Sequence, residues 1–292
     1  MRNIFIGSNG IRAGWRLLIY VALFAGIAWI LQLAGERVWH LHRPTGPMTP
    51  VFTVVADLFL LVPLLIAAFI MSRIERRSLG DYGLPLQSAA LSRVFVGAVV
   101  GFISLSLLLG IILATGGVHF AIAQLTPGVA VDGIVFVVGF VLVGLAEEFL
   151  FRGYTQYTLA QGIGFWPAGI VLSLLFAFAH VHNAGESLLG LVQVIVAGLV
   201  LCFVLKVTGN LWFAVGYHAA WDWSETFFYG VPDSGLQSAS SFLHGTMLGP
   251  TWLSGGSDGP EASFLATMIL LALIPLVWYL YGRAAGVSIQ ER

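Results

Sequence analysis

The chain has 292 residues, of which 58% are hydrophobic and only 9% are charged. Soluble domains carry roughly 25% charged residues, so this composition excludes an ordinary soluble domain and predicts an integral membrane protein within the lipid bilayer. The formal net charge of -1 offers no basic field for nucleic acid, and we expect no nucleic-acid partner. Helices satisfy their own backbone groups in lipid, so the predicted fold class is all-α, a polytopic transmembrane helical bundle.

Eight apolar runs of about the length that a bilayer requires follow one another along the chain. They lie near residues 15–34, 51–72, 94–115, 133–158, 163–181, 188–205, 210–229 and 262–282. Ionisable residues interrupt the fourth and seventh runs. We therefore expect one integral membrane domain over 1–292, with N-terminal spans over 1–115, a motif-bearing catalytic core over 133–229 and a last span over 262–282.

The basic residues predict the orientation, because Lys and Arg accumulate in cytoplasmic loops. If the N-terminus lies in the cytoplasm and eight spans alternate, all of the 13 Lys and Arg residues except Arg37 and Arg43 fall on the cytoplasmic side. The outside segments 116–132 and 230–261 contain none. We expect an integral protein of the plasma or inner membrane, with its N- and C-termini in the cytoplasm.

Several acidic residues lie outside the motifs. The segment 230–261 is rich in Gly, Ser and Pro and carries Asp233, Asp258 and Glu261, so we expect a solvated loop. Glu186 is expected in a short outside turn. Asp57 lies inside the second span and marks either a polar seam or a structural contact.

Glu147 and Glu148 stand side by side near the end of the fourth run. A carboxylate in hydrocarbon costs roughly 2.5–3.5 kcal/mol on insertion scales, so the pair needs partners, a wet cavity or a chemical task. On a helix Glu148 and Arg152 share a face and can pair, whereas Glu147 points about 100° away. Glu147 is then free to act as a general base. The alternative is an ion-paired helix end at the cytoplasmic interface.

Two later runs carry histidines with a neighbour one helical turn away. Phe176 and His180 share a face at the end of the fifth run. His218 and Asp222 share a face within the seventh, where Asp222 can fix the tautomer of His218 or stabilise its cation. The alternatives are an interfacial histidine at His180 and a structural His–Asp pair at His218.

These groups support two ways of activating water. In one, Glu147 and His180 activate a water that attacks a peptide carbonyl, and His218 donates to the oxyanion. In the other, Glu147, His180 and His218 bind zinc, which lowers the pKa of the bound water. The first scheme needs no cofactor. No His-Glu-x-x-His motif or Gly-x-Ser-x-Gly turn offers a different protease chemistry.

The motifs Glu147-Glu148-x-x-x-Arg152, Phe176-x-x-x-His180 and His218-x-x-x-Asp222 occur in this order on successive spans. This order resembles the CAAX protease and bacteriocin-processing family, also called CPBP or Abi, which includes the type II CAAX prenyl endopeptidases. The resemblance covers Gly133 to Tyr229, about a third of the chain. It implies a bundle of about eight transmembrane helices whose site opens to the cytoplasmic side.

The resemblance also implies roles for the motif residues. Glu147 and His180 activate the water, and His218 and the residue at Asp222 form the oxyanion hole. Glu148, Arg152 and Phe176 are supporting residues, and the favoured mechanism in the family is metal-free. The family has Asn or Asp at the last position. Because an ionised Asp would repel an oxyanion, we expect Asp222 to orient His218.

The predicted function is therefore an intramembrane endopeptidase, a hydrolase that cleaves a membrane-associated or prenylated peptide or protein. One alternative is a non-catalytic membrane scaffold or immunity protein of the same fold. Another is a proton-coupled transporter with a protonatable Glu and His path. A transporter predicts repeat symmetry between two halves, and the sequence has no internal repeat.

Overall fold

A computed structural model describes residues 5–7, 10–38, 46–123, 126–183 and 185–282. Both chain termini and Arg43, on which the predicted orientation partly depends, lie outside the described residues. In chain order the elements are β1 (Ile6–Gly7), β2 (Gly10–Ile11), α1 (Ala13–Val38), α2 (Pro50–Glu75), the 3₁₀ helix η1 (Leu79–Tyr82), α3 (Ala90–Ala114), β3 (Val118–Ile122), α4 (Pro127–Arg152), α5 (Tyr154–Ile163), α6 (Phe165–His180), α7 (Leu188–Thr208), α8 (Trp212–Trp223), the π-helix η2 (Ser224–Tyr229), β4 (Leu243–Met247), α9 (Thr251–Ser254), the 3₁₀ helix η3 (Pro260–Ala262), α10 (Phe264–Val277) and the π-helix η4 (Trp278–Gly282).

The predicted all-α polytopic bundle is confirmed, and each of the eight predicted runs is helical. Within the described chain, six helical stretches are long and apolar enough to cross a membrane. They are α1, α2, α3, α4 with α5, α7, and α10 with η4. The remaining two runs form shorter helices, because α6 has 16 residues and α8 has 12 before it continues as η2.

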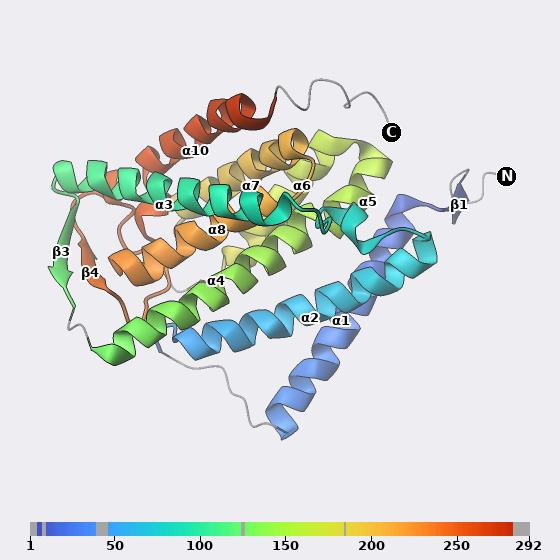
Figure 1. The fold of residues 1–292 in the computed structure, drawn as a ribbon, viewed down its shortest axis with the longest axis horizontal. Helices are drawn as coiled ribbons and strands as arrows, with labels where there is room; N and C mark the ends of the chain where they lie inside the picture. The colour runs from blue at the N-terminus through green and yellow to red at the C-terminus, as the bar shows by residue number, and fades with distance from the viewer. Residues whose placement is uncertain (1–4, 8–9, 39–45, 124–125, 184, 283–292) are drawn as a thin grey trace.

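The helices α2, α4, α7 and α10 start at one end of the bundle, which also carries β3, β4 and residues 230–263 (Figure 1). We call this the loop end. Each of the four helices begins on a hydroxyl side chain that accepts a backbone N–H, as helix N-caps do. The caps are Thr49, Thr126, Ser187 and Ser263. The opposite end, where α2 stops and α3 starts, carries Arg73, Arg76, Arg77 and Arg93, and we call it the basic end.

The predicted span 133–158 is not one continuous helix. The chain breaks at Gly153, between the end of α4 and the start of α5. A Cβ at Gly153 would lie 2.4 Å from the carbonyl oxygen of Phe149, so only glycine fits this backbone path. The break ends α4 directly after Arg152 and turns α5 onto α6 and α1.

Glycines let α8 pack closely against its neighbours α3 and α4. A Cβ at Gly101 of α3 would lie 2.3 Å from the carbonyl oxygen of Tyr217, and one at Gly216 of α8 would lie 2.1 Å from that of Val94. Small residues of this kind allow helix backbones to approach in membranes. The contact fixes the depth and rotation of α8, and therefore the position of His218.

We expect Gly101→Ala to destabilise the fold by about 1–3 kcal/mol, because the added methyl group has no space against α8. Gly110→Ala on the same helix is the matched control, since nothing lies within 4 Å of a Cβ at Gly110. Thermal unfolding of both purified variants in detergent measures the difference. Equal melting temperatures would contradict the close packing.

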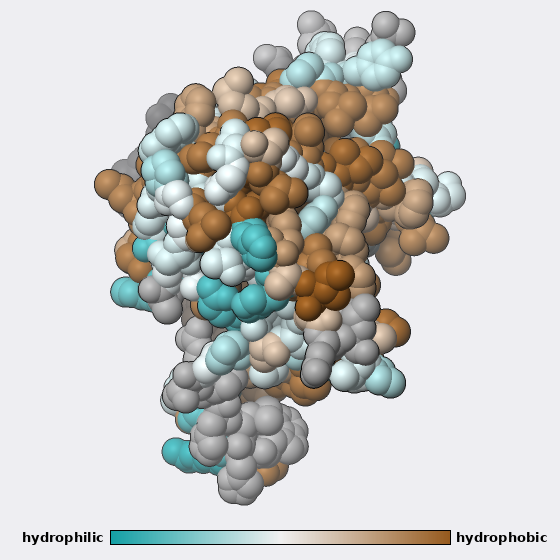
Figure 2. All heavy atoms as spheres, turned by 90° about the vertical axis from the view of Figure 1, so that its left-hand side faces the viewer, coloured by the Kyte–Doolittle hydropathy of each residue, from teal (hydrophilic) through white to brown (hydrophobic). Residues whose placement is uncertain are grey.

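The prediction of a solvated loop over 230–261 is wrong. β4 pairs antiparallel with β3, and Asp258 is only 1% exposed. Asp258 accepts hydrogen bonds from the backbone N–H and the hydroxyl of Ser187 at 2.8 and 2.5 Å, which fastens the segment to the start of α7. The segment therefore folds back onto the bundle, and Figure 2, which looks onto the loop end, shows hydrophilic residues gathered near its centre.

Candidate active site

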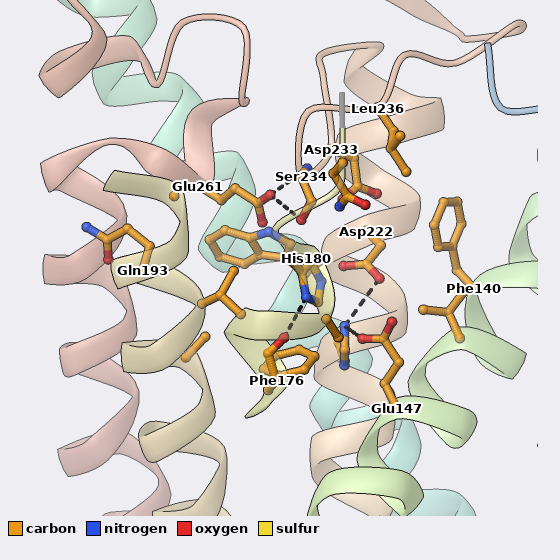
Figure 3. Close-up of a pocket in the computed structure, with 18 of the residues that line it drawn as sticks. Phe140, Glu147, Phe176, His180, Gln193, Asp222, Asp233, Ser234, Leu236 and Glu261 are labelled. Carbon is orange, nitrogen blue, oxygen red and sulfur yellow. Dashed lines mark hydrogen bonds and ion pairs between the residues drawn. The ribbon is translucent and has the colours of Figure 1, made fainter. Parts of the chain in front are cut away.

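A cavity of about 380 Å³ lies among α2, α4, α6, α7, α8 and α10. Figure 3 shows Glu147 and Phe176 at one end of it and Asp233, Leu236 and Glu261, from the loop end, at the other. The catalytic residues predicted from the sequence, Glu147, His180, His218 and Asp222, all line this cavity, as does Phe176. Two walls, from α2 and α10, come from outside the expected core 133–229.

The two glutamates occupy different environments, as their helical positions predict. Glu148 is fully buried and its Oε1 lies 3.2 Å from Arg152 Nη1, so the expected ion pair is present. Glu147 lies on the cavity wall with 23% of its side chain exposed. A substrate or water in the cavity can therefore reach Glu147, whereas Glu148 is enclosed by protein.

His218 contacts three carboxylates. Its Nδ1 donates to Glu148 Oε1 at 3.0 Å. Its Nε2 lies 3.4 Å from Asp222 Oδ2 and 3.6 Å from Glu147 Oε2. The expected His218–Asp222 contact is present, and Glu148 adds a second positioning group that the sequence did not indicate. An imidazolium can satisfy both sides with its two N–H donors, whereas a neutral ring has only one.

His180 is held in a defined tautomer. Its Nδ1 lies 2.9 Å from the carbonyl oxygen of Phe176, the residue one turn earlier, so Nδ1 carries the proton and donates it. In the neutral ring, the lone pair is then on the other nitrogen, Nε2. Because α6 ends at His180 and is short, His180 reaches the same cavity as Glu147 although it lies late in its helix.

The Phe176 ring packs among the other motif residues. It meets His180 edge to face, with ring centroids 4.8 Å apart, and the Arg152 guanidinium lies 4.4 Å from its centroid. A cation over an aromatic face is attracted to it, and more strongly away from water. Phe176 thus links the His180 helix to the Glu148–Arg152 pair, in agreement with a supporting role.

Zinc would need ligand atoms of Glu147, His180 and His218 gathered around one ion. Among the described residues, three side chains of a ligand type have ligand atoms within 4.8 Å of one another: Glu225, Asp233 and Glu261. The motif residues do not form such a group. In addition, both nitrogens of His218 already face carboxylates. These side chains do not form a compact zinc site. The expectation of a mechanism without a cofactor, and the zinc alternative, both stay predictions.

Sequence reasoning placed several cavity residues elsewhere or left them unexplained. Asp57 of α2 lines the cavity with Glu147, which accounts for a carboxylate inside the second span. Asp233 and Glu261 were expected in a solvated loop but line the cavity too. Burial raises the pKa of Glu261 to about 7 and that of Asp233 to about 6. No periodic pattern connects these residues to the motifs, because long-range chain folding brings them there.

Comparison with known proteins identifies one family that resembles part of the chain. Residues 129–224 match the family described as Rce1-like, Type II CAAX prenyl endopeptidase Rce1-like. The matched stretch holds all three motifs, and it confirms the resemblance that they indicated. No curated protein matches the chain.

Proposed function

We propose that this membrane protein, whose residues 129–224 match the Rce1-like type II CAAX prenyl endopeptidase family, is an intramembrane endopeptidase that uses a glutamate-activated water. The observation that carries the proposal is the asymmetry of the glutamate pair. Glu147 is accessible in the cavity, and Glu148 is enclosed and paired with Arg152. A general base must be reachable by the proton that it removes.

The residues fit the hydrolysis of a peptide bond. A water beside Glu147 gives its proton to the carboxylate, assisted by the Nε2 lone pair of His180, and its oxygen bonds to the scissile carbonyl carbon. The carbonyl oxygen becomes an oxyanion and accepts a hydrogen bond from Nε2 of His218. The C–N bond then breaks as the proton passes to the leaving amine. Asp222 and Glu148 hold the His218 ring in place.

The cavity wall suits an apolar substrate. Val194 and Leu201 of α7 and Ala266 and Leu270 of α10 line the cavity. Apolar surface of this kind favours a hydrophobic side chain or a lipid group over a polar peptide. We therefore propose a membrane-associated or prenylated peptide or protein as the substrate class.

A cleavage screen tests the function. Purified protein is incubated with a library of membrane peptides, some of them prenylated, and the products are identified by mass spectrometry. We expect His180→Ala and His218→Ala each to lower cleavage by at least about 10²-fold, as the loss of an acid–base or oxyanion group does. Full activity in both variants would contradict the proposed roles.

We also propose that the cavity opens to the extracytoplasmic side. It reaches the loop end through Ser234 and Leu236, whereas Arg73 and Arg93 lie at the basic end. The positive-inside rule places the basic end in the cytoplasm. This orientation keeps the predicted cytoplasmic N-terminus but differs from the cytoplasmic opening that the family resemblance implies.

Cysteine labelling in intact cells distinguishes the two orientations. Gln237 at the loop end and Gln87 at the basic end are both exposed, and the native Cys202 is buried. We expect a membrane-impermeant maleimide to label Gln237→Cys in intact cells, and Gln87→Cys only after permeabilisation. The reverse pattern would show that the cavity opens to the cytoplasm.

A further inference from the structure

Three carboxylates converge beside the catalytic cavity, at the loop end. They are Glu225 of η2, Asp233 of the following segment and Glu261 of η3. One oxygen of each lies within 4.8 Å of an oxygen of the other two. Glu225 and Asp233 are close in sequence, whereas Glu261 is brought to them by the way the segment 230–263 folds back.

Glu225 makes the cluster more than a group of acidic residues. Its side chain is fully buried, and neither carboxylate oxygen has a hydrogen-bond partner. The indole of Trp221 is a nearby donor, but it does not reach hydrogen-bond geometry with Glu225 and it carries no charge. Buried polar groups in native proteins are almost always paired, and an unpaired buried carboxylate is costly. The Glu225 carboxylate is directed at the other two and lacks only a positive partner.

The other two carboxylates are held in place and keep an oxygen for a ligand. Asp233 Oδ2 accepts from the Thr226 hydroxyl at 2.7 Å. Glu261 Oε1 accepts from the backbone N–H and the hydroxyl of Ser234 at 2.5 and 2.6 Å. Asp233 Oδ1 and Glu261 Oε2 take no part in these bonds. The ion pairs between described residues bring no Lys or Arg to this cluster.

We propose that Glu225, Asp233 and Glu261 bind a calcium ion. Calcium prefers oxygen ligands, takes six to eight of them and binds them at about 2.3–2.6 Å. Two oxygens on opposite sides of such an ion are about 4.6–5.2 Å apart, which accommodates the observed spacing. Magnesium binds at about 2.0–2.1 Å in a strict octahedron and needs a tighter set.

The site is separate from the water-activating residues, yet it acts on the same cavity. Asp233 and Glu261 line the cavity, and each also has a carboxylate oxygen close to Glu225. A bound ion would tie η2, which continues from the His218 helix, to the segment that covers the loop end. It would thus order the cavity mouth without taking part in peptide hydrolysis. If the loop end faces the extracytoplasmic side, as proposed above, a calcium site with a dissociation constant of about 10⁻⁴–10⁻³ M would be filled there.

Thermal unfolding of the purified full-length protein with CaCl₂ tests the site without any peptide substrate. We expect calcium to raise the melting temperature of the wild type after EGTA treatment, with MgCl₂ giving a smaller shift. Glu225→Gln and Glu261→Gln should each weaken calcium binding by at least about tenfold, because each removes one of three charged ligands. Glu36→Gln is the matched control, since Glu36 is exposed on α1 and should leave the shift unchanged.

Several results would overturn the assignment. One is a wild type whose melting temperature does not respond to calcium up to about 10 mM, which is above the range of weak extracellular sites. Another is an unchanged calcium shift in Glu225→Gln, or an equal or larger shift with magnesium. If Glu225→Gln does not fold, Glu261→Gln and the wild-type titration decide the question. Because none of these measurements uses cleavage, a failure of the protease proposal leaves the calcium result unaffected.

Discussion

Glu147→Gln is expected to lower the rate of peptide cleavage by at least about 10³-fold while the protein stays folded. The amide keeps the size and shape of the carboxylate but cannot take a proton from water at neutral pH. Since 23% of the Glu147 side chain is exposed to the cavity, the change should cost little stability. Cleavage kinetics and thermal unfolding of the same purified preparation measure both effects.

Glu148→Gln separates the two glutamates. Glu148 is fully buried between Arg152 and His218, so its replacement should lower the melting temperature as well as the activity. Two results would contradict the assignment of Glu147 as the base and Glu148 as a positioning residue. One is Glu147→Gln that cleaves at the wild-type rate, and the other is Glu147→Gln that loses as much stability as Glu148→Gln.

Arg152→Met is expected to destabilise the protein by about 3–5 kcal/mol, because it removes the guanidinium and leaves the buried Glu148 carboxylate with His218 alone. Both side chains of the pair are at most 1% exposed, so water cannot replace the lost partner. The guanidinium also packs 4.4 Å from the centroid of the Phe176 ring. Thermal or denaturant unfolding in detergent measures the loss.

A matched control and a double variant sharpen this test. Lys206 lies over the Phe165 ring, and no ion pair between described residues includes it. Lys206→Met should therefore change stability much less than Arg152→Met. The double variant Glu148→Gln with Arg152→Met should recover part of the loss, because no buried charge remains unpaired. Equal effects of Arg152→Met and Lys206→Met would contradict the importance of the buried pair.

Local spacing predicted those parts of the site that lie within one helical turn. Glu148 with Arg152, and His218 with Asp222, are four residues apart, and both contacts are present. The helices themselves were predictable because apolar runs of span length have few other folds in lipid. The number of full-length spans was harder to predict, because α6 and α8 are short helices within the bundle.

Contacts between distant segments were not predictable in this way. The bond from His218 to Glu148 joins residues 70 apart, and no local period links them. Asp57, Asp233 and Glu261 reach the cavity only through the packing of α2 and the return of the segment 230–263. In sequence that segment looks like a polar loop. Its carboxylates are buried only because donors such as Ser187 and Ser234 meet them in the folded state, and the sequence does not show these contacts.

Hydrolysis in water enriched in ¹⁸O tests the role of Glu147 most directly. A peptide that the wild type cleaves is incubated for a fixed time with wild type and with Glu147→Gln at equal concentration, and the products are weighed by mass spectrometry. We predict a new carboxyl terminus carrying one ¹⁸O from the wild type, and no product above background from Glu147→Gln. An ¹⁸O-labelled product formed equally by both proteins would contradict a water activated by Glu147.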